Sequence, residues 1–273
     1  MIKKAIIPAA GYGTRSLPIT KVVPKEMFPI GNKPAIHYIV EEAVNSGVEQ
    51  ILIVLSRTKN LIVDYFDYSL ELEAFLKRED KSHLLNEFSI PDIQIHYTRQ
   101  PYARGLGEAI KLTETFIGND PFAVLLPDDI VISDKEPALN QLIKIYQETN
   151  SSVIGIHTVP DEALGKYGIV KGDIVKKDYM QITDIVEKPK VNPPSNFAVI
   201  GRYVFTPDIF PLLKNIKPGV GGEYQLTDAI HSLLTMKNVY GKIIDGNRYD
   251  IGQEDEYIQL LNLIYKQNKG SKN

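Results

Sequence analysis

Hydrophobic and polar positions follow two periods along this chain of 273 residues. Short apolar runs rich in β-branched residues predict buried strands, and longer amphipathic stretches predict helices. Over the first 160 residues the two kinds of segment alternate. The expected strands are 5–8, 50–55, 93–98, 122–127 and 153–159, and the expected helices are 35–46, 61–68, 70–86, 105–117 and 137–148.

This alternation indicates the fold class. Strand–helix–strand units with right-handed crossovers build parallel sheets, so we expect an α/β, Rossmann-like fold with a mixed, mostly parallel sheet flanked by helices. Beyond residue 160 the pattern changes to short strands between 167 and 186, a proline-rich break at 189–194, a strand at 197–205 and helices at 223–236 and 255–266. We expect a single domain over residues 1–265, in two halves that meet near residue 160, and a frayed polar tail over 266–273.

Composition and charge exclude several classes of protein. The formal net charge of −3 gives no broad cationic surface for nucleic acid or an anionic membrane. The absence of cysteine excludes disulfides, thiolate catalysis and cysteine-ligated zinc. No stretch approaches the roughly 18–20 apolar residues of a membrane-spanning helix, and Pro8 and Gly11 interrupt the first apolar run too early for a signal peptide. We therefore expect a cytoplasmic protein.

A loop of small residues follows the first predicted strand, over residues 8–15. Small side chains let backbone N–H groups approach an anion, and Arg15 adds a fork of donors that suits phosphate. Lys25 supplies a second cation downstream. Any one of these features alone is more typical of a tight turn with solvated charges. The loop is not a dinucleotide fingerprint, because Ser16 replaces the required glycine or alanine, and the sequence contains no P-loop motif.

Carboxylates follow the apolar strand at 122–127 and precede the last helix. Asp128 and Asp129 lie at the strand end, where a carboxylate is costly unless it is solvated or bound to metal. Asp250 adds a third carboxylate. Mg²⁺ prefers carboxylate and phosphate oxygens, so a magnesium site is one interpretation. The alternatives are an Asp-rich turn for the first two and a helix-start turn for the third.

Polar residues follow two further strands. Gln100 can donate and accept hydrogen bonds, as reading one edge of a pyrimidine requires, although with Gly105 it is also an ordinary loop and helix start. Glu187 can accept from sugar hydroxyls and Lys188 can bind phosphate, although alone they are an exposed ion pair. Neighbouring side chains on a strand point to opposite faces, so one of this pair must sit at a bend, beside Pro189.

Taken in order, these motifs resemble the sugar-nucleotide pyrophosphorylase family, and within it the bacterial UTP–glucose-1-phosphate uridylyltransferases. The resemblance covers about residues 3–265. It is carried by the loop at 8–15 and by Lys25-Glu26-Met27, Gly105-Leu106-Gly107, Leu126-Pro127-Asp128-Asp129, Val186-Glu187-Lys188-Pro189 and the segment 222–228. One departure is Glu108, which stands where the family commonly has histidine.

The resemblance implies transfer of a uridylyl group from UTP to glucose 1-phosphate, with Mg²⁺ as cofactor. It makes residues 1–160 the nucleotide-binding half and 161–265 the sugar-binding half, and it implies a homodimer or homotetramer. It implies catalytic roles for Arg15, Lys25, Asp128 and Lys188, nucleotide contacts by Ala9, Ala10, Gly11, Gly13, Gln100 and Gly105, sugar–phosphate contacts by Gly168, Glu187 and Lys188, and a metal held by Asp128 and Asp250, with Asp129 second.

The sugar phosphate is already an anion near neutral pH, so we expect its direct attack on the α-phosphorus with inversion. The segment 222–228 fits a helix start equally well and stays outside the predicted site, and the five histidines show no ligand spacing.

Two alternatives stay open: the same chemistry with dTTP or another hexose 1-phosphate, and a non-catalytic regulatory paralogue that binds sugar nucleotides. An NAD-dependent oxidoreductase is disfavoured by Ser16 and by the lack of an acidic ribose reader.

Overall fold

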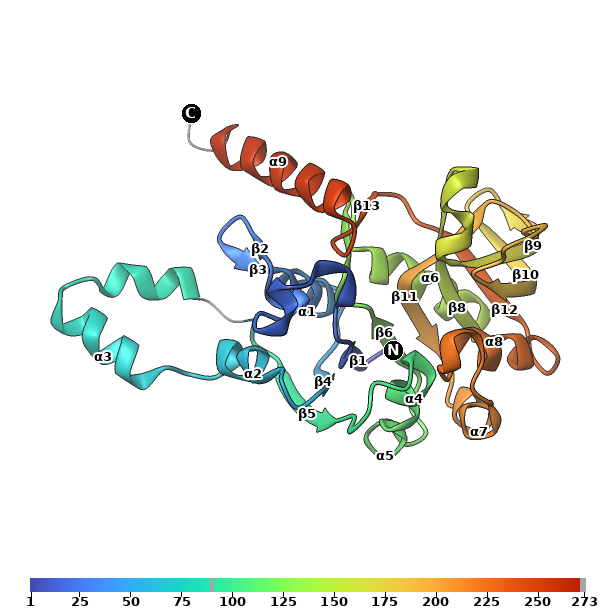
Figure 1. Ribbon diagram of the computed structural model, residues 1–273, viewed down its shortest axis with the longest axis horizontal. Coiled ribbons are helices and arrows are strands. Elements are labelled where there is room, and N and C mark those ends of the chain that lie inside the picture. The colour runs from blue at the N-terminus through green and yellow to red at the C-terminus, as the bar shows by residue number, and fades with distance from the viewer. Residues whose placement is uncertain (89–90, 271–273) are drawn as a thin grey trace.

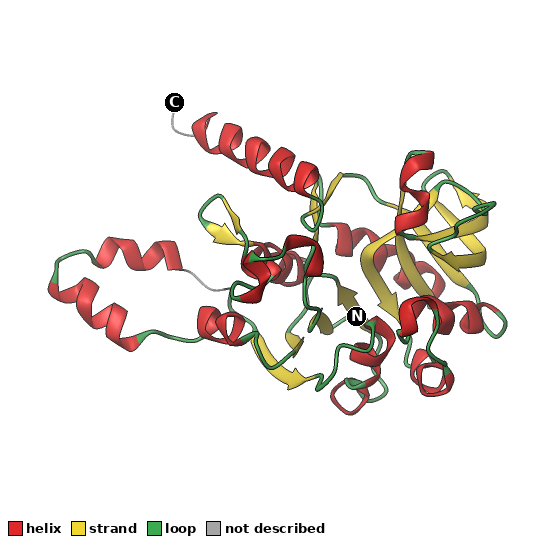
Figure 2. Ribbon diagram, viewed as in Figure 1, coloured by secondary structure: helices red, strands yellow, loops and turns green. Residues whose placement is uncertain are grey.

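A nine-stranded sheet crosses the whole molecule in the computed structural model, which describes residues 1–88 and 91–270 (Figure 1, Figure 2). The strand order is β5-β4-β1-β6-β11-β8-β12-β10-β9. Helices lie on both faces, as the strand–helix alternation predicts. The fold is therefore a mixed α/β fold.

The first half of the sheet is parallel. Its strands are β1 (Lys4–Ala9), β4 (Gln50–Leu55), β5 (Gln94–Arg99) and β6 (Phe122–Leu125), and β1 lies between β4 and β6. The helices that connect them include α1 (Ala35–Asn45), α2 (Asn60–Phe66), α4 (Leu106–Lys111) and α5 (Glu114–Ile117). Because these strands run in one direction, their carboxyl ends meet at one edge, where ligands bind in open α/β sheets.

The second half of the sheet corrects the expectation of a mostly parallel sheet. Its strands are β8 (Ser152–Thr158), β9 (Gly168–Lys176), β10 (Tyr179–Glu187), β11 (Phe197–Phe205) and β12 (Val239–Ile243). Only four of the nine pairings in the sheet are parallel. The physical reason is local: β9 and β10 are joined by a tight hairpin, which forces antiparallel pairing, and β11 runs against β6, β8 and β9.

Two small sheets complete the strands. In one, β7 (Asp129–Ile132) pairs antiparallel with β13 (Asn247–Asp250), and in the other β2 (Pro29–Ile30) pairs with β3 (Lys33–Pro34). The remaining helices are α3 (Leu70–Arg78), α6 (Ala138–Thr149), α7 (Ile209–Asn215), α8 (Leu226–Leu234) and α9 (Glu254–Gly270). Helices α3 and α9 both project from the body of the molecule (Figure 1).

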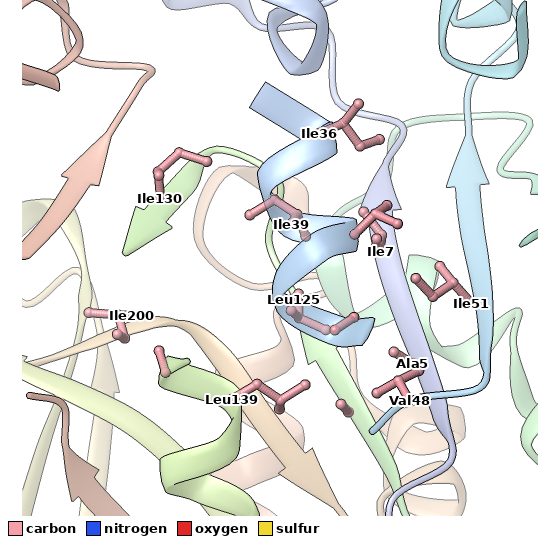
Figure 3. Packing of buried hydrophobic residues seen from close by; sticks show 14 of the residues in the cluster. Ala5, Ile7, Ile36, Ile39, Val48, Ile51, Leu125, Ile130, Leu139 and Ile200 are labelled. Atoms are coloured by element: carbon pink, nitrogen blue, oxygen red, sulfur yellow. The ribbon is translucent and has the colours of Figure 1, made fainter. Parts of the chain in front are cut away.

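The hydrophobic core has two layers, one on each face of the sheet. Alternate residues of β1 point to opposite faces, so Ile7 belongs to one layer and Ile6 to the other. The first layer packs under α1 and α6, where Ile36 and Ile39 of α1 face Ile7 (Figure 3). The second layer packs under α4, α7 and α8. Both layers lie beneath the strand ends and hold the site residues in place.

The predicted segments agree with the structure where the period is long or the strand is buried. The strands predicted at 50–55 and 197–205 match β4 and β11. The helix predicted at 70–86 ends at Arg78, and a 3-10 segment follows at Ser82–Phe88. The helix predicted at 105–117 divides into α4 and α5, and the one predicted at 223–236 begins only at Leu226. Helix α9 runs on to Gly270, past residue 266, where a frayed tail was expected; residues 271–273 of that tail lie outside the described residues.

Among residues 1–88 and 91–270, no helix combines the length and the apolar character that crossing a membrane requires.

A candidate active site at the strand ends

A cavity of about 590 Å³ opens beside the carboxyl ends of the central strands. Its lining joins segments that are far apart in sequence. The predicted site residues that line it are Arg15, Asp128, Gly168, Glu187, Lys188 and Asp250. The predicted nucleotide residues Ala9, Ala10, Gly11, Gly13, Gln100 and Gly105 are not part of this lining, and neither is Lys25.

The small-residue loop follows β1 directly. Gly13 has φ 64°, a left-handed conformation that favours glycine. An added Cβ at Gly13 would lie 3.1 Å from Cγ2 of Thr20, whose hydroxyl donates to the Gly13 carbonyl at 2.9 Å. The turn directs the next residues into a 3-10 segment, Thr14–Ser16, which carries Arg15. Lys25 starts a later 3-10 segment, Lys25–Met27.

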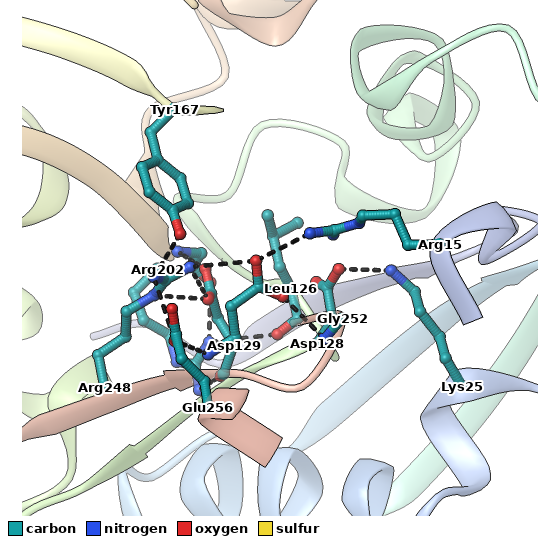
Figure 4. A network of polar contacts seen from close by, with 12 residues as sticks. Arg15, Lys25, Leu126, Asp128, Asp129, Tyr167, Arg202, Arg248, Gly252 and Glu256 are labelled. Carbon is teal, nitrogen blue, oxygen red and sulfur yellow. Dashed lines mark hydrogen bonds and ion pairs between the residues drawn. The ribbon is translucent and has the colours of Figure 1, made fainter. Parts of the chain in front are cut away.

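The two predicted cations pair with the two predicted metal ligands. The ammonium of Lys25 contacts Oδ2 of Asp128, and Nη1 of Arg15 lies 3.1 Å from Oδ2 of Asp250 (Figure 4). Burial opposes ionisation of Asp128, but the neighbouring Lys25 outweighs it and holds the pKa of this carboxyl below its usual range. Burial also opposes the charge on Lys25, yet Asp128 and Glu26 keep its pKa above the usual value. Both groups are therefore charged at neutral pH.

The pairing of β7 with β13 brings the carboxylates together. Asp129 stands opposite Asp250 in the register of these strands, and the carbonyl of Asp128 accepts from the backbone N–H of Ile251 at 2.9 Å. This small sheet therefore joins the carboxylates that follow β6 to the one near the C-terminus. Neither short strand was predicted from the sequence.

Asp129 is occupied by protein partners. Its Oδ1 accepts from Nε of Arg248 at 2.7 Å, and its Oδ2 accepts from the backbone N–H of Gly201 at 2.8 Å. Arg248 also donates to the hydroxyl of Tyr167 at 3.0 Å and stacks over its ring (Figure 4). These contacts use both oxygens of Asp129, so its geometry fits a structural role.

Arg202 links the turn at Leu126–Asp129 to helix α1 and strand β11. It is fully buried, and it donates through Nε and Nη2 to the two carboxylate oxygens of Glu42 at 2.8 and 2.7 Å. Its remaining donors reach the carbonyls of Leu126, Gly201 and Asp129. Helix α1, strand β11 and the turn before β7 are thus tied to one guanidinium. The local signal is a single charged residue inside the apolar run 197–205, but nothing in the sequence points to its partner Glu42, 160 residues away.

On the opposite side of the cavity, β10 ends at Glu187 and the chain bends. Lys188 has φ 45°, a left-handed conformation, so the bend predicted from strand alternation lies at Lys188. Its ammonium is 3.3 Å from Oε1 of Glu187. The hydroxyl of Thr227 donates to Oε2 of Glu187 at 2.6 Å. An added Cβ on Gly168 would lie 3.4 Å from that same oxygen, so Gly168 keeps this corner open.

The base-reading candidates lie at the ends of β4 and β5. The backbone N–H of Gln100 donates to the carbonyl of Leu55 at 2.9 Å, which places Gln100 beside the end of β4 and one strand from Ala9. Gly105 has φ 110°. Added Cβ atoms on Gly105 and Gly107 would lie 2.7 and 2.8 Å from the carbonyl oxygen of Tyr224. The glycines of this motif therefore serve close contact with the segment before α8.

That contact involves a segment outside the predicted site. The segment 222–228 fits a helix start in the sequence, yet Gln225, Leu226 and Thr227 line the cavity. The backbone N–H of Gly107 donates to the carbonyl of Tyr224 at 2.8 Å, so the segment joins helix α4 to the cavity lining. The sequence signal for it is its place among the ordered motifs that carry the family resemblance. Arg248 and Tyr167 also line the cavity and were not assigned roles.

The donor set fits a hard cation. Asp128 and Asp250 supply carboxylate oxygens to the same cavity. Among residues 1–88 and 91–270, no group of three or more histidine, cysteine, aspartate or glutamate side chains could hold a metal ion. Mg²⁺ is commonly bound by one or two carboxylates together with water and substrate phosphates. The arrangement thus suits a metal that arrives with a phosphate ligand.

Comparison with known proteins agrees with this geometry. The family model described as nucleotidyl transferase matches residues 4–267. A Bacillus subtilis (strain 168) protein that is provisionally named UTP–glucose-1-phosphate uridylyltransferase is 59% identical, over 98% of this chain and 99% of its own. The UTP–glucose-1-phosphate uridylyltransferase of the same strain is 48% identical, over 94% and 89%. A crystal structure of UDP-glucose pyrophosphorylase complexed with UDP-glucose has a TM-score of 0.89 and 44% identity, over 98% of this chain and 100% of that one.

Coverage is close to complete in each case, and the sequence identities are well above the level at which only a fold is shared. The chain therefore belongs to the nucleotidyl transferase family, within its bacterial UTP–glucose-1-phosphate uridylyltransferases.

Proposed function

We propose that this chain transfers a uridylyl group from UTP to glucose 1-phosphate, giving UDP-glucose and pyrophosphate, with Mg²⁺ as its cofactor. One observation carries the proposal: Arg15 and Lys25 pair with Asp250 and Asp128, and these two carboxylates line the same strand-end cavity as Glu187 and Lys188. The two substrates are those in the name of the relative that is 48% identical.

The reaction joins two polyanions, so charge neutralisation is its first requirement. Arg15 and Lys25 would hold the triphosphate, and Lys188 would hold the phosphate of the sugar. An oxygen of the sugar phosphate attacks the α-phosphorus, the bond to the bridging oxygen of the β-phosphate breaks, and pyrophosphate leaves. No general base is required, because the attacking oxygen is already ionised, and inversion at phosphorus follows. Isolation of a uridylyl-enzyme would contradict this course.

Mg²⁺, held by Asp128 and Asp250, would neutralise phosphate charge and align the triphosphate. Both carboxylates are engaged with Lys25 and Arg15 in the free protein. Binding of a triphosphate draws these cations onto its oxygens and frees the carboxylates for the metal. We expect Mg²⁺ and UTP to strengthen each other's binding for this reason.

Glucose hydroxyls are the natural partners of Glu187. Thr227 fixes one of its oxygens, and the other faces Lys188. We propose that Glu187 accepts from the sugar while Gly168 leaves room for the ring. For the nucleotide, we propose contacts by backbone groups of Ala9, Ala10, Gly11 and Gly13 and by Gln100 and Gly105.

Pyrophosphate release in MgCl₂ tests the function. UTP and dTTP are each combined with glucose, galactose and N-acetylglucosamine 1-phosphates, with Asp128→Ala as the inactive control. Preference for UTP with glucose 1-phosphate, lost in the variant, is the expected result. Binding of UDP-glucose without turnover of any pair would instead establish a regulatory paralogue.

A second candidate is the same chemistry with another hexose 1-phosphate. It is favoured by one observation: of two relatives from the same strain, this chain is 59% identical to the provisionally named one and 48% identical to the other. The galactose and N-acetylglucosamine combinations in the same assay distinguish the two candidate functions, because these differ only in the preferred sugar 1-phosphate.

Three further expectations belong to this proposal. Residues 1–160 would serve as the nucleotide half and 161–265 as the sugar half of one domain. The protein would assemble as a homodimer or homotetramer, which sedimentation would establish. A cytoplasmic location also stays a prediction.

A further inference from the structure

Gln100 is a buried side chain at the edge where the parallel strands end. It follows β5, its backbone N–H donates to the carbonyl of Leu55 at the end of β4, and the residue as a whole is only 3% exposed. A polar side chain that is nearly buried at this edge must satisfy its hydrogen-bonding groups within the protein or with a ligand. The partners of its amide therefore decide what it can recognise.

Both amide hydrogens of Gln100 have protein acceptors. Nε2 donates to Oε2 of Glu108 at 2.8 Å and to the carbonyl of Gly105 at 3.3 Å. A carboxylate and a carbonyl only accept hydrogen bonds, so the NH₂ group must face them. The chemistry of the two partners thus fixes which way the amide points. The oxygen, Oε1, is the group left to face a ligand.

Glu108 is itself held in place. Its other oxygen, Oε1, accepts from Nε of Arg104 at 2.8 Å, so each carboxylate oxygen has its own donor. Its side chain is 13% exposed. Burial opposes ionisation, but the hydrogen bonds from Arg104 and Gln100 keep the pKa of Glu108 below its usual range. It therefore stays an acceptor at neutral pH.

We propose that Glu108 is a positioning residue that turns Gln100 so that Oε1 accepts from the N3–H of a uracil-type base and excludes cytosine. The inference rests on the proposed function only in placing a nucleotide base beside Gln100. Uracil and thymine both carry an N3–H donor, whereas N3 of cytosine is an acceptor. With cytosine, two acceptors would face each other without a hydrogen, and a buried polar group left unpaired is costly.

Glu108→Gln tests this positioning role, because glutamine keeps the shape of the side chain and replaces one carboxylate oxygen by an NH₂ group. The new carboxamide can present only one oxygen, and the cationic Arg104 takes it because charge-assisted hydrogen bonds are the stronger ones. Its NH₂ group then faces Gln100 and turns that amide over, so Gln100 offers a donor to the base. The remaining contact to Gly105 is long and opposes this only weakly.

The measurement is calorimetric binding of UTP and of CTP in MgCl₂. In the wild type we expect a large preference for UTP. In Glu108→Gln the ratio of the two dissociation constants should shift by about tenfold or more towards CTP. Glu108→Leu removes the carboxylate acceptor and leaves the Gln100 amide with only its long contact to the Gly105 carbonyl, so it should give a smaller shift in the same direction. Glu114→Gln is the matched control, because Glu114 is an exposed carboxylate whose partner is Lys214, and it should leave the ratio unchanged.

A folded Glu108→Gln protein with the wild-type ratio, or with both nucleotides weakened equally, would overturn the inference, because a merely structural residue affects both alike. A wild type that binds UTP and CTP equally would also overturn it. The proposed function fails separately: tight, selective UTP binding without turnover would remove the transferase and leave the role of Glu108 standing.

Discussion

The ammonium of Lys25 lies against the carboxylate of Asp128, 103 residues away in sequence. Arg15 and Asp250 form the matching pair, with 3.1 Å between Nη1 and Oδ2. In the free protein the groups expected to hold phosphate therefore neutralise the groups expected to hold metal. When substrate binds, both ion pairs must therefore separate, so that the two cations contact phosphate and the two carboxylates contact metal.

Replacement of Lys25 tests two effects separately, the loss of a cation for the triphosphate and the release of the Asp128 carboxylate. In Lys25→Met we expect turnover to fall by about 100-fold or more, because a cation aimed at the triphosphate is lost. Mg²⁺ should bind the free variant more tightly than the wild type, because Asp128 has lost its competing partner. Steady-state kinetics and calorimetric Mg²⁺ titration check the two effects. Lys21→Met, at an exposed neighbouring position, is the control, and wild-type turnover in Lys25→Met would contradict the role.

The hydroxyl of Thr227 provides a test on the sugar side. In Thr227→Val, Glu187 loses the hydrogen bond that fixes one of its oxygens. We expect the KM for glucose 1-phosphate to rise by about tenfold, consistent with loss of one hydrogen bond to a charged group, while the KM for UTP changes little. Thr227→Ser keeps the hydroxyl and should behave as the wild type. Equal increases in both KM values would point to general disruption instead.

The buried pair of Arg202 and Glu42 is expected to be costly to break. Arg202→Met leaves the Glu42 carboxylate, whose side chain is 9% exposed, without its partner. The free energy of unfolding should fall by about 3–5 kcal/mol, measured by urea denaturation. The double variant Arg202→Met/Glu42→Leu should recover much of that loss. If the single variant is as stable as the double one, the pair has no such role.

Gly107 tests the close contact between α4 and the segment before α8. An added Cβ would lie 2.8 Å from the carbonyl oxygen of Tyr224 and 2.9 Å from Cδ1 of Ile216. Gly107→Ala should therefore destabilise the protein by about 1–3 kcal/mol, seen as a lower Tm. Gly165→Ala, whose Cβ would meet only the carbonyl of Pro189 at 3.7 Å, should leave Tm nearly unchanged.

Glu41 gives stability a dependence on acid pH. Its contacts with the imidazole of His37 and the ammonium of Lys33 outweigh partial burial and lower its pKa from 4.5 to about 2. Because the folded pKa is depressed, this contribution is complete above pH 4.5 and is lost as the pH falls towards 2. Glu41→Gln should flatten the fall of Tm across this window. An unchanged profile would show that Glu41 is not responsible; partial exposure keeps the effect modest.

Local pattern was sufficient for the buried strands and for one unusual backbone position. The apolar runs of β4 and β11 identified those strands fully. The alternation of side chains on a strand required a bend near Glu187, and Lys188 provides it with its positive φ. Asp128 also stood out, since a charged group after an apolar strand contrasts with its surroundings, and it lines the cavity. Each of these features is encoded within a few residues.

The features that were not predicted depend on distant partners. Strands β7 and β13 are four residues each, β7 beginning and β13 ending in a carboxylate, so neither shows a convincing period, and each forms only by pairing with the other. The hydrogen bond from Thr227 to Glu187 spans 40 residues, and that from Arg202 to Glu42 spans 160. The antiparallel insertion of β11 between β6 and β8 likewise depends on tertiary packing.

The pairing of β7 with β13 has a consequence during synthesis on the ribosome. The parallel strands β1, β4, β5 and β6 all belong to the first 125 residues. Asp250, in contrast, is made after all of them and reaches its place only when β13 docks on β7. A growing chain thus completes the parallel half of its sheet long before it holds all three carboxylates. A messenger cut short before the codons for β13 would yield a product that lacks Asp250 and the partner strand of β7.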